Sequence, residues 1–322
     1  MKQEARHKMV ILYQLLLAYI LLTLWIPIYD AKSSPVSRMG VTFSPAGLLT
    51  PYHLGVAMCL RENGMITEAT ALAGSSGGSI VATTEALNMD SKEILEACVR
   101  VASACRERGT YRTLASALHT ELEALLPDNC ACTLREREAR LTVAYQKIWP
   151  SVEAVNQKVF KSKSDLMKAV EASCTIPFYY SGLPFTTLLD GGRAIDGFFT
   201  TPRSRFGCPQ TQCEIEIAVC TFDHLAVGLT ANTMVISPRL LMDRHGDADY
   251  HNHFYSTLQL AQLALAPPQK RDLRGENEFP GAAVGFCNDE EILQVYKTLY
   301  GAGKRSAEVF LETNKVFNKN RA

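Results

Sequence analysis

The sequence predicts an α/β protein, because short apolar strands alternate with segments whose apolar residues follow helical spacing. A glycine- and serine-rich turn at residues 74–78 joins one such strand to one such helix. Hydrophobic residues make up 47% of the 322-residue chain, which is enough for a sizeable core. We expect residues 1–39 to form an N-terminal segment with a linker and residues 40–322 to form one α/β domain.

The N-terminal segment contains an uncharged run from Met9 to Tyr29, and Lys2, Arg6 and Lys8 precede this run. About 20 apolar residues suffice to cross a bilayer as a helix. The exit, Ile28–Ser33, is a poor cleavage site for a signal peptidase. The run therefore predicts a hydrophobic helix that acts as an uncleaved signal anchor, with a cleaved signal peptide or a monotopic insertion as alternatives. The basic residues favour a cytosolic N-terminus and a lumenal domain.

The elements of the domain follow from apolar spacing and from residues that start or stop helices. Gly64 stops one helix, Asp90 or Ser91 caps the next, and Pro127 ends another. Runs with β-branched residues indicate strands. The expected strands are residues 40–44, a strand ending at 70–73, 140–145, 159–160, 213–221 and 233–237. The expected helices are 52–63, the segment after the turn at 74–78, a helix from 90 or 91, 114–125, 164–172, 254–266 and 289–316.

The turn itself reads Gly74-Ser75-Ser76-Gly77-Gly78, which has the form G-x-S-x-G of a nucleophile elbow. A serine at the tip of a sharp strand-to-helix turn exposes its hydroxyl, and glycines let neighbouring backbone pass close to it. The N-terminus of the following helix supplies unpaired N–H groups that suit an oxyanion. Ser76 is therefore a candidate nucleophile, although a plain Gly-Ser turn is the alternative.

Charge and cysteine content argue against other functions. Lys and Arg total 33 and equal Asp and Glu at 33, so no basic excess indicates nucleic acid. The ten cysteines are scattered, and neither the pair Cys130 and Cys132 nor the pair Cys208 and Cys213 has the spacing of a zinc site. We expect no metal and no organic cofactor.

A serine nucleophile needs a base, and the sequence offers histidines or aspartates. Two Asp-Gly pairs begin at Asp190 and Asp196 in one segment, although Asp-Gly is also a common turn pair. Histidines would instead indicate a triad of the α/β-hydrolase type. The histidines after Ser76 are His119, His224, His245, His251 and His253.

Together these blocks resemble the patatin-like phospholipase family, in the branch that contains adipose triglyceride lipase. The resemblance rests on the G-x-S-x-G turn followed by an Asp-Gly segment, and on three further blocks. These are the loop Ser44–Leu49, the helix Tyr52–Glu62 and the segment Ser173–Tyr179. It covers residues 40–200 clearly and implies a layered sheet with flanking helices.

The resemblance implies a Ser–Asp dyad without histidine. Ser76 would be the nucleophile, and Asp196 is favoured over Asp190 as the base because Asp196 falls in the hydrophobic-hydrophobic-Asp-Gly block of the family. The implied oxyanion hole comprises Gly47, Leu48 and Gly77. The chain departs from the family pattern at Pro45, Thr50 and Phe198.

The implied activity is a serine acyl hydrolase that cleaves ester bonds of triacylglycerol or glycerophospholipid through an acyl-enzyme. Transfer of the acyl group to a second lipid is the variant of this reaction. The expected partners are the lipid substrate and a membrane or lipid-droplet surface. The three departures favour an alternative, a catalytically weak lipid-binding or scaffold protein.

Overall fold

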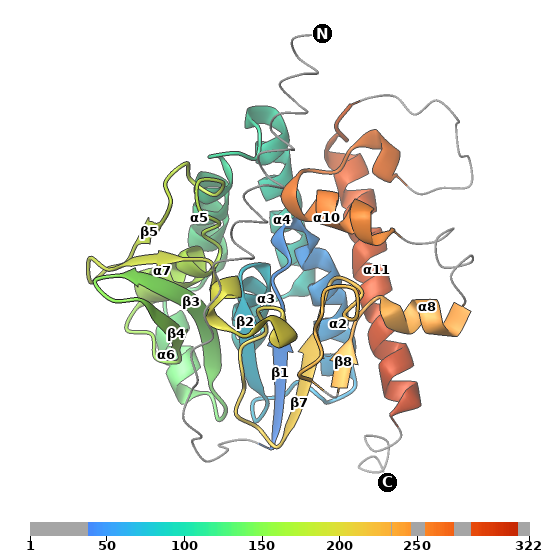
Figure 1. The fold of residues 1–322 in the computed structure, drawn as a ribbon, viewed down its shortest axis with the longest axis horizontal. Coiled ribbons are helices and arrows are strands. Elements are labelled where there is room, and N and C mark those ends of the chain that lie inside the picture. The colour runs from blue at the N-terminus through green and yellow to red at the C-terminus, as the bar shows by residue number, and fades with distance from the viewer. Residues whose placement is uncertain (1–37, 233, 246–254, 274–284, 315–322) are drawn as a thin grey trace. The chain divides into compact units, whose positions relative to one another are not determined.

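The structure, a computed structural model, describes residues 38–232, 234–245, 255–273 and 285–314. An eight-stranded sheet forms its centre, with strand order β5-β6-β3-β2-β1-β7-β8 and with β4 paired to β3. Helices surround the sheet, as Figure 1 shows; α7 packs against β3, and α11 contacts β8. The predicted α/β class is therefore confirmed.

Five parallel strands form one side of this mixed sheet. They are β1 (Met39–Phe43), β2 (Ala71–Ser75), β3 (Leu141–Trp149), β7 (Ile215–Val219) and β8 (Met234–Ile236). Side chains on both faces are buried, and Val41, Leu72 and Val219 are fully inaccessible. Strands covered on both faces are rich in apolar residues, as β1 and β2 are, while β3 and β7 also contain Gln146, Lys147 and Glu216. Their carboxyl ends meet at one edge of the sheet, where Ser76 follows β2.

Three further strands extend the sheet in the antiparallel sense. They are β4 (Glu153–Gln157), β5 (Thr186–Thr187) and β6 (Arg193–Ile195). The register brings the end of β6 level with the end of β2, because Ile195 pairs with Gln146 while Ser75 pairs with the nearby Ala144. Asp196, the next residue after β6, therefore lies at the edge where Ser76 lies.

The helices begin and end at recognisable signals. Asp90 caps α4 by accepting a hydrogen bond from the Lys92 N–H at 2.9 Å, and Asn288 caps α11 through a reciprocal bond pair with Glu291. The helices are α2 (Thr50–Glu62), α3 (Gly77–Ala86), α4 (Ser91–Arg108), α5 (Leu114–Leu125), α6 (Cys130–Glu136), α7 (Lys163–Ser173), α8 (Arg239–His245), α10 (Thr257–Leu265) and α11 (Asp289–Thr313). Short 3-10 turns occur at η1 (Gly47–Leu49), η2 (Gly197–Thr200), η3 (Arg203–Arg205) and η4 (Lys270–Asp272).

Several expected boundaries were wrong, and two of them show why. The strand expected at residues 159–160 lies earlier, at β4, where it pairs with β3. Helix α7 begins at Lys163 rather than at residue 164, and its cap is Ser162 rather than Ser164 or Asp165, because the Ser162 hydroxyl accepts the Asp165 N–H at 3.1 Å. Helices α6 and α8 were not expected.

The run from Met9 to Tyr29 lies outside the described residues, so the signal anchor and the boundary at residue 39 stay predictions. Among the helices that the structure does describe, none combines the length and the hydropathy of a membrane span.

Candidate active site

Ser76 occupies a strained turn between β2 and α3. Its backbone has φ 51° and ψ −132°, a conformation that residues with a Cβ rarely adopt. The Ser76 N–H donates to the Ser173 hydroxyl at 2.9 Å, and the Ser76 carbonyl accepts the N–H and hydroxyl of Ser79 at 2.9 and 2.7 Å. Strain of this kind persists only where surrounding bonds hold it, and it concentrates at functional sites.

Gly78 in the turn is required by close approach of a neighbouring strand end. A Cβ at Gly78 would lie 2.4 Å from the Ser44 carbonyl oxygen and 2.5 Å from the Phe43 carbonyl oxygen. Any larger residue would therefore push the first turn of α3 away from the end of β1. The glycine places the loop after β1 beside the N-terminus of α3.

Asp196 is buried, with 3% of its surface exposed, and its backbone N–H donates to the Thr175 carbonyl at 2.9 Å. Its Oδ1 accepts the Phe198 N–H at 2.8 Å. Its Oδ2 is buried and has no hydrogen-bond partner of full geometry among the described residues. The Ser76 side chain acts on the Asp196 carboxyl as a hydrogen-bond donor that lowers its pKa, so the Ser76 hydroxyl lies next to this carboxyl. Catalytic hydrogen bonds are often long before substrate binds.

The burial of Asp196 sets its acidity. Desolvation raises the pKa of the carboxyl to about 7, while hydrogen bonds from the Phe198 N–H and the Ser76 hydroxyl act in the opposite direction. A carboxylate with a pKa near neutral pH is a far stronger base than an exposed one. The carboxylate is therefore suited to accept the Ser76 proton.

Asp190 has none of these properties. Its side chain is 61% exposed and pairs with the Lys147 ammonium at 3.0 Å, and it accepts the Gly192 N–H at 2.8 Å. These contacts lower the pKa of Asp190. The segment is the turn between β5 and β6, as the favoured register implied. The structure brings Asp196, and not Asp190, to Ser76.

The expected oxyanion loop lies next to the serine. Gly47 has φ +54°, and a Cβ there would lie 2.1 Å from the Ala264 carbonyl oxygen, so only glycine fits. The Gly47 carbonyl accepts the Thr50 hydroxyl at 2.9 Å, which means that Thr50 stabilises the turn. Gly47, Leu48 and Gly77 all line the same cavity as Ser76. Gly77 opens α3, so its N–H has no acceptor within the helix.

His53 is a site residue that the sequence did not reveal. It is fully buried in α2, and its Nε2–H donates to the Ser44 carbonyl at 2.9 Å, just before the oxyanion loop. Burial lowers the pKa of His53 to about 4, so the ring is neutral and acts as a donor that anchors the loop. The only sequence signal for His53 was its position, one turn into the helix that follows the expected oxyanion loop.

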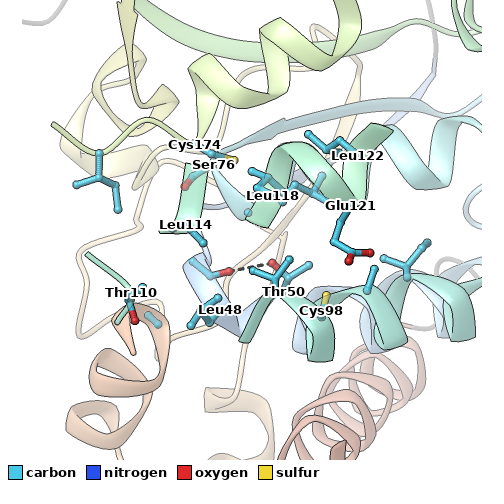
Figure 2. A pocket seen from close by; sticks show the side chains of 18 of the residues that line it. Leu48, Thr50, Ser76, Cys98, Thr110, Leu114, Leu118, Glu121, Leu122 and Cys174 are labelled. Atoms are coloured by element: carbon cyan, nitrogen blue, oxygen red, sulfur yellow. Dashed lines mark hydrogen bonds between the residues drawn. The ribbon is translucent and has the colours of Figure 1, made fainter. Parts of the chain in front are cut away.

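A cavity leads away from Ser76, and its walls come mainly from α4 and α5. Figure 2 shows Ser76 and Cys174 together at one side and Glu121 at the other, with Leu118 between them. The volume is about 80 Å³. Most of the lining side chains are aliphatic, including Ile80, Ile94, Val101, Leu114, Leu122, Leu125 and Ile176.

The cavity contains two groups that bear on its chemistry. Burial raises the pKa of the Cys174 thiol well above its usual value, so this thiol stays protonated and does not compete as nucleophile. Glu121 forms a bidentate pair with Arg100, with Nη2 and Oε2 2.8 Å apart. The far side of the apolar cavity therefore ends at an ion pair.

The described histidine side chains offer no partner for Ser76. His119 contacts the Glu171 carboxylate at 2.6 Å and His224 contacts the Ser237 hydroxyl at 2.8 Å. His251 and His253 lie outside the described residues, as does the side chain of His245. Within the described part of the chain, no cluster of three or more His, Cys, Asp or Glu side chains has the arrangement of a metal site.

The strained serine, the buried aspartate and the parallel sheet are the features of one family of lipid enzymes. The sequence profile of the patatin-like phospholipase family matches residues 41–201, half of the chain. The chain belongs to this family. The matched range contains the loop at Gly47, the turn at Ser76 and Asp196.

Individual relatives are distant. Patatin-like phospholipase domain-containing protein 2 of Mus musculus is 29% identical over 165 residues, which cover 50% of this chain and 33% of that protein. The 1-acylglycerol-3-phosphate O-acyltransferase Pnpla3 of Mus musculus is 25% identical over 170 residues, 51% of this chain and 40% of that one. The omega-hydroxyceramide transacylase of Homo sapiens is 26% identical over 177 residues, which cover 52% of this chain and 32% of that protein. The chain thus matches about a third of the length of these relatives.

One solved structure, VipD from Legionella pneumophila, aligns over 88% of this chain and 69% of its own with a TM-score of 0.41 and 12% identity. This likeness carries no argument about function.

Proposed function

We propose that the chain is a serine acyl hydrolase that cleaves lipid esters through a Ser76–Asp196 dyad. One observation carries the proposal: the buried Asp196 carboxyl, whose Oδ2 accepts no hydrogen bond of full geometry, lies beside the hydroxyl of a strained serine that lines an apolar cavity. A buried oxygen whose hydrogen bonding is incomplete costs free energy, so its retention indicates a role. That role is to accept the serine proton.

In the proposed reaction, Asp196 removes the proton of the Ser76 hydroxyl as the oxygen attacks the ester carbonyl. The N–H of Gly77 and an N–H of Gly47 or Leu48 stabilise the oxyanion. The tetrahedral intermediate expels the alcohol, which takes the proton from Asp196 and leaves an acyl group on Ser76. Water then attacks the acyl-enzyme with Asp196 again as base, and the free acid leaves.

A second lipid can take the place of water as the acceptor of the acyl group. Two relatives carry names of acyl transfer, an acyltransferase and a transacylase. Both hydrolysis and transfer pass through the same acyl-serine, so the dyad serves either outcome. The apolar cavity favours a fatty acyl chain as the group bound next to Ser76. The substrate places the enzyme at a membrane or lipid-droplet surface.

The second candidate is a lipid-binding protein with weak catalysis. Pro45 favours this candidate, because proline has no N–H to offer to an oxyanion. The loop nevertheless retains Gly47 and Leu48, both of which line the cavity.

A lipid panel tests the proposal. The purified protein is incubated with triacylglycerol, glycerophospholipid and lysophospholipid, alone and with monoacylglycerol as acceptor, and products are identified by mass spectrometry. We expect free fatty acid or a newly acylated lipid from the parent and from a Ser116→Ala control, whose exposed hydroxyl bonds only to the Thr113 carbonyl. Ser76→Ala should lose at least a thousandfold in rate. Equal rates for Ser76→Ala and the parent would refute the assignment.

A further inference from the structure

Several large apolar side chains are exposed next to segments that line the cavity, and we refer to this side of the cavity as its mouth. Phe178 is 46% exposed and lies in sequence between Ile176 and Tyr179, which both line the cavity. Leu183 is 58% exposed, and its carbonyl accepts the Phe178 N–H at 2.9 Å. Tyr111, 51% exposed, follows the cavity residue Thr110.

Helix α10 adds a further apolar face beside the same opening. Leu265 follows the cavity residue Ala264, and its carbonyl accepts a hydrogen bond from the Tyr179 hydroxyl. Leu258 lies seven residues earlier, on the same face of the helix, and is 71% exposed. The helix contains no charged residue. We call Tyr111, Phe178, Leu183, Leu258 and Leu265 the mouth surface.

The backbone holds two loops of this surface in strained conformations. Phe178 has φ 63° and Arg112 has φ 68°, values that are unusual for residues with large side chains. The Arg112 N–H donates to the Tyr179 carbonyl at 3.0 Å, which ties the two loops together. Strain retained at an exposed aromatic indicates that its outward position serves a function.

One cation accompanies the apolar side chains. The Arg112 guanidinium lies 4.8 Å from the centre of the Tyr111 ring. An aromatic ring beside a basic residue suits the boundary between lipid head groups and acyl chains.

We propose that the mouth surface docks onto the surface of a lipid aggregate, so that an acyl chain passes from the aggregate to Ser76 without crossing water. The inference rests on the proposed lipid substrate and adds the face by which the protein meets it. Continuity with the cavity selects this occupant, because Tyr111, Phe178 and Leu265 each directly precede or follow a residue that lines the cavity. Phe178, Leu183 and Leu265 enter the acyl region, and Arg112 meets the head groups.

Depth-dependent fluorescence quenching tests the docking on the full chain. Leu183→Trp is compared with Val159→Trp, both on a Ser76→Ala background that leaves the vesicles intact. Val159 is the matched control because it is also exposed, at 61%, and lies away from the cavity. It follows Lys158, whose ammonium donates to the Gln212 side chain. The neighbouring Thr211 contacts Gly40 near the start of β1. That is the opposite edge of the sheet from Ser76. The vesicles contain phosphatidylcholine brominated along its acyl chains.

We expect brominated vesicles to reduce the added fluorescence of Leu183→Trp at least threefold more than that of Val159→Trp. Phe178→Ser in the Leu183→Trp protein should reduce this quenching at least twofold, with thermal unfolding as the check on its fold. Equal quenching at both sites would overturn the proposal. A change in Leu183→Trp fluorescence that depends on protein concentration and not on lipid would mean that the mouth surface binds a second copy of this chain. That result would also overturn the proposal. Quenching requires no turnover, so its failure is distinct from a failure of Ser76 to act as nucleophile.

Discussion

Replacing Asp196 with asparagine should stabilise the fold at pH 8 while it abolishes ester hydrolysis. In the folded protein the pKa of Asp196 is about 7, against an ordinary value of about 3.9. Between pH 4 and pH 7 the folded state therefore keeps a proton that the unfolded state has lost. Stability falls as the pH rises through this window and stays at its lower value above pH 7.

The size of the effect follows from the shift. About 3 pKa units at 1.36 kcal/mol each give an upper limit of about 4 kcal/mol at pH 8. Asparagine carries no charge, so Asp196→Asn removes the free-energy cost of burying a carboxylate. The Nδ2 group of the asparagine, however, must find a hydrogen-bond acceptor at the position that Oδ2 occupies. We expect a net gain of about 1–3 kcal/mol, or roughly 2–6 °C in Tm for a domain of this size.

Thermal unfolding at pH 8 and pH 4 provides the assay. At pH 4 Asp196 is protonated in the folded state and partly so in the unfolded state, so most of the gain should disappear. Asp190→Asn is the matched control, because this exposed carboxylate pairs with Lys147 and should give no gain at pH 8. A gain of equal size at both pH values, or a loss of stability at pH 8, would refute the reasoning.

Three further predictions concern activity and localisation. The kcat/KM for a soluble short-chain ester should rise with pH through about 7 and fall about tenfold per pH unit below it, because only ionised Asp196 accepts the proton; a flat pH–rate profile would contradict this. Leu118→Trp should fill part of the cavity and lower kcat/KM for long acyl chains at least tenfold more than for acetyl esters, which a chain-length series measures and a uniform loss would refute. Removing residues 1–30 should release the protein from carbonate-washed membranes while soluble-ester hydrolysis persists, and loss of that activity would show that the segment packs on the domain.

The sequence predicted the parts of the site that short local patterns encode. The turn at Ser76 depends on glycines within two residues of it, so G-x-S-x-G identified it directly. Asp196 was favoured over Asp190 through the family resemblance, and the strand register gives the physical reason. β6 ends level with Ser75, whereas Asp190 lies in the turn before β6.

The remaining parts depend on contacts between distant segments. Ser173 is 97 residues from Ser76, and although it opens a segment that resembles the family, no local pattern indicates its hydrogen bond to Ser76. The walls contributed by α4 and α5 read as ordinary amphipathic helices, because a residue that faces a cavity is as apolar as one that faces a core. The strand β4 was misplaced since its sequence, EAVNQ, is mostly polar and has only one β-branched residue.

Covalent labelling with a fluorophosphonate, followed by peptide mass spectrometry, tests the central claim most directly. The proposed dyad predicts a single adduct on Ser76 in the parent and in Asp190→Asn, none in Ser76→Ala, and labelling at least a hundredfold slower in Asp196→Asn. An adduct on another residue, or unchanged labelling rates in Asp196→Asn, would contradict the assignment of Ser76 as nucleophile and Asp196 as its base.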